Sequence, residues 1–205
     1  MATNFKSKAN TNGSGFALLM TLIVVTVVIS IGLTVLDLSI KQVRLSTNSR
    51  DSETSFHAAN AGVECARYIR RTESANMEVG NNITPACFGG TLSTDTHSQI
   101  TTSISGDGQA FKYIYDFSWG SVGEPRCTEV ITLVASATPI VGAGLGSGLI
   151  VSNMTSHIAG YSSPTNSWSC AAGERCTVLS VKGYNRSCSP TYGYGTIERE
   201  VLLQF

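Results

Sequence analysis

The sequence has little charge for its size. Only 14% of its 205 residues are charged, and 14 Lys and Arg balance 14 Asp and Glu, so the formal net charge is zero. A chain without net charge creates no global field that would attract nucleic acid or acidic lipid. Long-range electrostatic steering is therefore excluded as the basis of its function.

The sequence also lacks the motifs of common catalytic and metal sites. No cysteine pair has C-x-x-C spacing, and the three histidines, His57, His97 and His157, are scattered. No serine, histidine and acid follow a recognisable catalytic order. In "GAGLGSG" (142–148), Ser147 stands where a dinucleotide-binding motif needs its last glycine, and no regular helix follows. We therefore expect no enzyme, no cofactor and no metal.

A calcium site is a weaker alternative. Asp95, Asp107 and Asp116 carry the oxygen ligands that calcium prefers. Asp107 is already explained by a predicted turn, and Asp116 by an exposed strand face. We therefore favour structural roles for these carboxylates.

One long hydrophobic run is present near the N-terminus. Residues 16–36 carry no charge and are numerous enough to cross a bilayer. The run is longer than the core of a secretory signal, and no A-x-A-like cleavage site follows it. Residues 1–15 contain Lys6 and Lys8 and no acid, which predicts a cytoplasmic leader with the rest of the chain outside the membrane.

The helical pattern continues beyond this run, through residues 37–72. Apolar residues recur at steps of three or four, and Arg70 and Arg71 suit a helix C-terminus. One helix from about residue 16 to residue 71 would be roughly 80 Å long. The residues predicted to form its second apolar face are Phe56, Ala59, Val63, Ala66 and Ile69.

These features resemble the type IV pilins and pseudopilins. "GFALLMTLIVV" and "RDSETSFHAANAGVECA" are similar to the PilX-like minor pilins, over about residues 13–71. The resemblance implies cleavage by prepilin peptidase between Gly15 and Phe16, methylation of the Phe16 amine, and assembly with other pilin subunits. It also implies a filament stem in which Phe56, Ala59 and Val63 take part.

The chain departs from that family at one position. Major pilins carry a glutamate at the fifth mature position, where this chain has Met20. In the family, this carboxylate is thought to pair with the methylated amine of a neighbouring subunit. Its absence suggests a minor subunit that initiates or caps a surface pilus. The alternatives are a pseudopilin of a type II-like secretion system and an unprocessed, membrane-anchored surface binding domain.

Residues 73–205 predict an α+β head in which four or five antiparallel strands face the helix. A hairpin is predicted around "GDG" (106–108), a buried strand at 129–141, and further strands at 176–185 and 196–205. Aromatic residues of the head suggest a sugar, protein or DNA ligand as the alternative to ordinary core packing. They are Trp119, Tyr161, Trp168, Tyr184, Tyr192 and Tyr194.

All six cysteines follow the membrane segment, so an oxidising compartment and three disulfides are expected. Fifteen pairings of six cysteines are possible. Positions along the chain favour Cys65 with Cys87, Cys170 with Cys176, and Cys127 with Cys188.

Overall fold

The structure is a computed structural model, and it describes residues 14–84, 86–87, 90–91, 96–120, 125–137, 148–188 and 195–205. The chain divides into two compact units, with the boundary between Ser49 and Arg50. The helices are α1 (Ser14–Thr72), α2 (Ser74–Val79) and the 3-10 turn η1 (Met154–Ser156). The strands are β1 (Ala86–Cys87), β2 (Gly90–Thr91), β3 (Thr96–Gln99), β4 (Ile104–Ser105), β5 (Gly108–Trp119), β6 (Arg126–Ala137), β7 (Leu149–Ser152), β8 (Ser167–Cys170), β9 (Arg175–Tyr184) and β10 (Glu198–Gln204).

The described part of the first unit consists of the N-terminal part of α1. Every side chain described from Gly15 to Ser49 is exposed, and the best 18-residue window has a mean hydropathy of 2.7. The hydroxyls of Thr21, Thr26 and Thr34 donate hydrogen bonds of 2.8–2.9 Å to backbone carbonyls one turn earlier. These bonds satisfy the hydroxyls within the helix, as a lipid environment requires. The helix is therefore long and apolar enough to cross a membrane.

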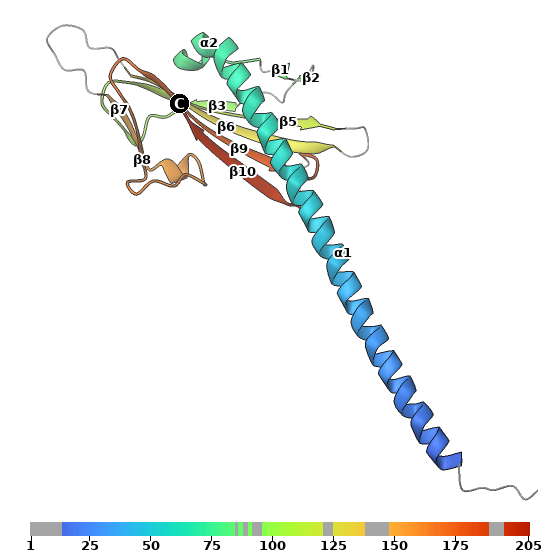
Figure 1. The fold of residues 1–205 in the computed structure, drawn as a ribbon. Coiled ribbons are helices and arrows are strands. Elements are labelled where there is room, and N and C mark those ends of the chain that lie inside the picture. Colours follow the sequence, from blue (N-terminus) through green and yellow to red (C-terminus); the bar gives the residue numbers. More distant parts are fainter. Residues whose placement is uncertain are drawn as a thin grey trace, which may run out of the picture. The chain divides into compact units, whose positions relative to one another are not determined.

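The second unit is built on a five-stranded antiparallel sheet with the order β10-β9-β6-β5-β3 (Figure 1). Its centre is the pairing of β5 with β6, which runs from Gly108 opposite Ala137 to Trp119 opposite Arg126. The C-terminal part of α1 lies against one face of this sheet, as the shared core cluster shows. The expected combination of a long helix with a small antiparallel sheet is confirmed.

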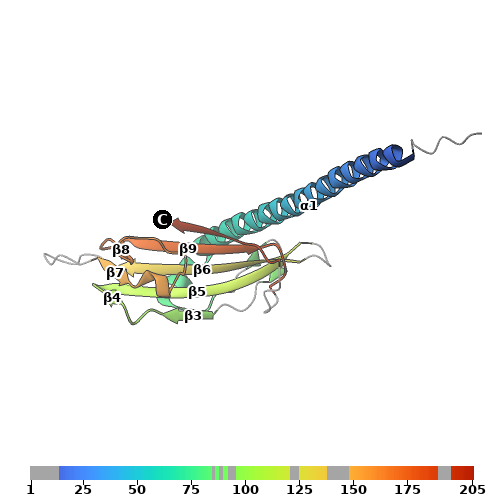
Figure 2. The same cartoon turned by 90° about the horizontal axis from the view of Figure 1, so that it is seen from below.

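Both faces of the central sheet are buried. On β6, Val130 and Val134 belong to the core shared with α1, whereas Leu133 and Ala135 belong to a second core. This second core lies between the central sheet and a three-stranded sheet of order β4-β7-β8, which Figure 2 shows beside it. Two-sided burial explains why residues 130–135 of β6 are apolar at every position except Thr132 instead of alternating. The second sheet was not predicted.

The hairpin predicted around residues 106–108 is wrong. The strand that pairs with β5 is β3, which ends at Gln99, and Ile104 instead begins β4 and pairs with Val151 of β7. Gly106 has a φ of +96°, and a Cβ there would collide with the backbone of Gly148. The glycine therefore allows two chain segments to approach closely at the second sheet, and it does not form a tight hairpin turn.

The helix packs on the sheet through its smallest residues. Ala58 and Ala59 are fully buried, and a Cβ on Gly62 would collide with the side chains of Thr128 and Val181. The Thr128 hydroxyl donates a 3.0 Å hydrogen bond to the carbonyl of Ala58. The backbone of α1 therefore lies close to β6 and β9.

The helix spacing is right for Ala59, Val63, Ala66 and Ile69, which are buried, but wrong for Phe56. The Phe56 side chain is 51% exposed, and Ser55 is the buried residue at this point. The Ser55 hydroxyl contacts the carbonyls of Asp51 and Ile197, 2.9 and 2.8 Å away. A small side chain fits this close approach, and a phenylalanine does not.

Three disulfides reinforce the second unit. Cys65 of α1 is bonded to Cys87 of β1, Cys127 of β6 to Cys188, and Cys170 of β8 to Cys176 of β9. These are the pairings that the positions along the chain favour. The last one does more than close a short loop, because β8 and β9 belong to different sheets.

Candidate functional site

The predicted cleavage site lies at the start of α1. Gly15 is the second residue of the helix, and Phe16 is 68% exposed. No atom in the described part of the chain lies within 4 Å of the position that a Cβ on Gly15 would occupy. Packing among the described residues therefore gives no reason for a glycine at position 15.

The apolar surface of α1 continues from this point. Met20, at the position where the expected resemblance to major pilins would place a glutamate, is 48% exposed, and Leu18, Leu19 and Leu22 nearby are exposed as well. A shallow depression further along the helix extends from Gly32 to Arg44 and includes Leu36, Ser39 and Ile40. A Cβ on Gly32 would also meet no described atom within 4 Å. This surface has room for a neighbouring helix or for lipid.

The three assembly residues expected in the second half of α1 are separated by the fold. Ala59 and Val63 are buried against the sheet of their own chain, so they are not available to a second subunit in this structure. Phe56 is exposed on the outer side of the helix, and Tyr68, at 59% exposure, is exposed as well. Of the three, Phe56 is the one that another chain can contact.

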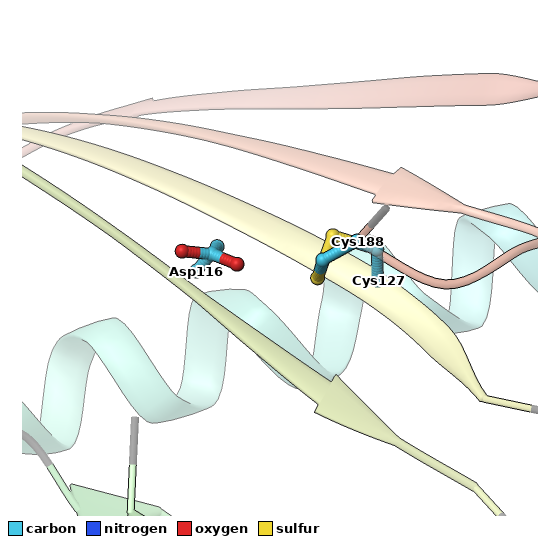
Figure 3. A group of neighbouring side chains, drawn as sticks. All are labelled: Asp116, Cys127 and Cys188. Atoms are coloured by element: carbon cyan, nitrogen blue, oxygen red, sulfur yellow. A yellow bond between two sulfur atoms is a disulfide. The ribbon is translucent and has the colours of Figure 1, made fainter. Parts of the chain in front are cut away.

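Asp116, Cys127 and Cys188 form a cluster of potential metal ligands, with their ligand atoms within 4.8 Å of one another. Figure 3 shows the carboxylate of Asp116 beside the two sulfurs. The sulfurs are bonded to each other, so neither is a thiolate that could bind a metal. The cluster is therefore a disulfide next to an aspartate, and we assign no metal to it.

Most of the aromatic residues considered as ligand contacts are core residues. Tyr161, Trp168 and Tyr184 are at most 7% exposed. Trp119 lies under the guanidinium of Arg126, with 5.8 Å between its ring centroid and the Arg126 Cζ. Ordinary packing explains these four residues, so they do not form an exposed ligand platform. Tyr192 and Tyr194, together with Asp95 and residues 142–147, lie outside the described residues.

Within the part of the chain that the structure describes, four titratable side chains have pKa values shifted from their ordinary ones. Burial lowers the pKa of Lys112, and burial together with the Lys112 charge lowers that of His157. Burial raises the pKa of the Tyr115 hydroxyl. Burial also lowers the pKa of Lys182, but its ion pair with Glu198 reverses the net direction, so that this pKa is raised. Each shift has a packing cause, and no catalytic arrangement follows from them.

A buried ion-pair network connects the end of α1 to the sheet. Arg70 donates from a terminal nitrogen to Glu78 of α2 at 3.0 Å and from Nε to the Thr177 hydroxyl at 3.0 Å. The second oxygen of Glu78 is 3.1 Å from Nε of Arg175. The side chains of Arg70 and Glu78 are only 11% and 10% exposed. The local pattern indicates only a cation at a helix end for Arg70, because Glu78 lies on the next helix and Thr177 is 107 residues away.

Comparisons with known proteins add no relative. Protein-family models, curated proteins and solved structures each gave no significant match to this chain. The functional argument therefore depends on the residues and their geometry.

Proposed function

We propose that this chain is a membrane-anchored minor subunit of a type IV pilus-like filament. In this proposal, prepilin peptidase cuts between Gly15 and Phe16, and the new Phe16 amine is methylated. Residues 16–36 hold the subunit in the cytoplasmic membrane with the head outside. The subunit then joins other pilins, initiating or capping a surface filament for adhesion, motility or DNA uptake.

The observation that carries the proposal is the exposure of α1 from Gly15 to Ser49. This half of the helix is strongly apolar, and its described side chains are exposed in the single chain. An exposed apolar surface of this size needs lipid or other protein around it. A helix that moves from a membrane into a filament core would be surrounded first by lipid and then by other protein.

The position of Gly15 supports processing as the reason for this glycine. Glycine inside a helix costs about 0.5–1 kcal/mol relative to alanine. No described atom crowds Gly15, so packing within this chain does not explain the glycine. Recognition by a peptidase that requires glycine before its cleavage point explains it.

The experiment is peptide mass spectrometry of the N-terminus of the protein purified from its native host. We expect a peptide that begins at methylated Phe16. The Gly15→Ala variant should retain the leader, while Gly13→Ala serves as the matched control and should be processed normally. Normal processing of Gly15→Ala would overturn the proposal, and an intact leader in the wild type would favour the anchored binding domain.

Met20 provides a second test, specific to a minor position. Met20→Glu restores the family carboxylate within the exposed apolar surface. We expect the variant to insert into the membrane but to enter filaments at internal positions, measured by immunogold labelling along isolated filaments; Met20→Gln is the uncharged control. An unchanged filament number and label distribution would remove the argument for a tip subunit.

A secretion pseudopilin is the second candidate, because it shares the same stem. In that case, deletion of the gene would abolish secretion of a substrate protein and leave surface pili unchanged.

A further inference from the structure

A cavity of about 440 Å³ lies at the end of α1 within the second unit. It is remote in sequence from the membrane segment, and no function discussed above uses it. Its lining is dominated by arginines. The lining residues are Arg67, Arg70, Arg71, Arg175, Thr177 and Phe205.

The fold explains why these residues meet. Arg67, Arg70 and Arg71 are three and four positions apart, so they share one side of the last helical turns. Arg175 is the first residue of β9. Backbone hydrogen bonds of 2.7 and 3.0 Å between Thr177 and Phe205 place the aromatic residue at the same end of the sheet.

The cavity has more positive charge than its ion pairs neutralise. Glu78 serves both Arg70 and Arg175, and Glu64 lies 3.4 Å from Arg67. Arg71 has no ion pair within the described residues. Four guanidinium groups against two side-chain carboxylates therefore leave an excess of positive side-chain charge. The negative end of the α1 dipole amounts to about half a charge and does not cancel this excess.

The arginines have different roles. Arg70 is nearly buried and fully engaged with Glu78 and Thr177, so it is a positioning residue. Arg175 uses Nε for Glu78, and its side chain is 67% exposed, so its terminal nitrogens can bind an oxyanion. Arg71 is exposed as well. Planar guanidinium forks of this kind suit phosphate and carboxylate oxygens.

We propose that this cavity binds a phosphate monoester. Arg71 and Arg175 bind the phosphate oxygens, and Phe205 contacts the organic stem. A phosphate monoester carries a charge of about −1.5 to −2 at neutral pH, which a lining of four guanidinium groups attracts more strongly than a single charge. A carboxylate carries only one charge. The site is independent of the filament proposal, because all its residues lie in the second unit and none lies in residues 16–36.

The test uses the full-length protein in neutral detergent micelles with phenyl phosphate as the probe. Isothermal titration calorimetry at low ionic strength should give saturable one-to-one binding. Arg71→Gln should weaken this binding about tenfold, because it removes a charge-assisted hydrogen-bond donor. Arg199→Gln, an equal change of charge on β10, is the matched control and should leave affinity unchanged.

Further titrations distinguish the contributions of phosphate charge and of the organic group to the affinity. Benzoate should bind at least about fivefold more weakly, since it has one charge fewer. Affinity for phenyl phosphate should fall between pH 7.5 and pH 5.5, because the second phosphate pKa is about 6. Inorganic phosphate should bind more weakly than the ester, since it makes no contact with Phe205.

Three results would overturn the proposal. The first is that wild-type protein with a normal circular dichroism spectrum shows no saturable binding. The second is that Arg71→Gln and Arg199→Gln lose affinity for phenyl phosphate equally. The third is that benzoate binds as tightly as phenyl phosphate. Arg175→Lys provides a second variant that keeps the charge but loses the fork, and it should also weaken binding. Equal affinity for inorganic phosphate would remove the monoester assignment.

Discussion

The two halves of α1 belong to one helix but have opposite surroundings. Nineteen large apolar side chains between Phe16 and Leu45 are exposed, whereas the described residues from 50 to 205 expose five. In the second half, the buried face consists largely of small residues, such as Ala58, Ala59 and Gly62. The first half is thus made for partners outside this chain, and the second for the close approach of its own sheet.

This comparison separates two uses of hydrophobicity. Exposed aliphatic side chains in the first half need an apolar environment, which water does not provide. In the second half the gain comes from close packing, where bulk would be harmful because the helix backbone lies near Thr128 and Val181. A substitution should therefore have different effects in the two halves, even when its chemistry is the same.

The largest effect on the free energy of unfolding is expected from the loss of a disulfide. All six cysteines belong to the second unit, so this effect concerns that unit alone. Replacing Cys127 and Cys188 by serine opens a loop with a sequence separation of 61 and should lower the free energy of unfolding by about 4 kcal/mol. The same change at Cys170 and Cys176, separated by 6, should cost about 2 kcal/mol.

Urea denaturation monitored by tryptophan fluorescence measures these two changes. Helical circular dichroism from the first half of α1, in micelles, should persist after the head has unfolded. An equal loss of stability in both double variants would contradict the loop-length argument. Loss of all helical signal together with the head would contradict the separation of the two halves.

The next effect compares two glycines in the same helix. Gly62→Leu forces the side chains of Thr128 and Val181 to move and should lower the free energy of unfolding by about 3 kcal/mol. Gly32→Leu is the matched control, because no described atom crowds that position. The Gly32→Leu variant should leave the melting temperature of the head unchanged, as measured by thermal denaturation.

The glycine comparison also tests the proposed assembly. If a neighbouring helix occupies the depression at Gly32, then Gly32→Leu should reduce incorporation into filaments while the head stays folded. If Gly62→Leu leaves the melting temperature within about 1 °C of the wild type, the close contact between helix and sheet does not exist as described.

Sequence reasoning predicted what depends on local pattern. The apolar run, the length of the helix and most of its buried face follow from composition and from steps of three and four. Phe56 was the exception, because periodicity indicates which face of the helix points toward the sheet but not how large a side chain fits there. Only the sheet on the other side explains why Ser55 is buried and Phe56 is exposed.

Contacts between distant segments were the part that the sequence did not predict. Ile104 looks like part of a hairpin, yet its partner is Val151. The arginine cavity is lined by residues of α1 and β9 and by Phe205, which no local pattern connects. The disulfides were an intermediate case, since cysteine positions restrict the choice but permit fifteen pairings.

The smallest effect expected is a pH dependence that belongs to the head alone. Burial and the charge of Lys112 hold the pKa of His157 below its ordinary 6.5, so folding favours the neutral imidazole. The unfolded chain binds a proton near pH 6.5 and the folded chain does so only at lower pH. This contribution to stability is therefore present above pH 6.5 and is lost as the pH falls through the folded pKa.

His157→Gln removes this titration without adding a charge. We expect its free energy of unfolding to depend less on pH between about pH 6.5 and pH 5 than that of the wild type, by urea denaturation at each pH. His57→Gln, the same substitution at an exposed position in α1, is the matched control variant. If the slopes of wild type and His157→Gln coincide, acid sensitivity of the head has another source. A change only in His157→Gln would place that sensitivity at the second core, far along the chain from the apolar first half of α1.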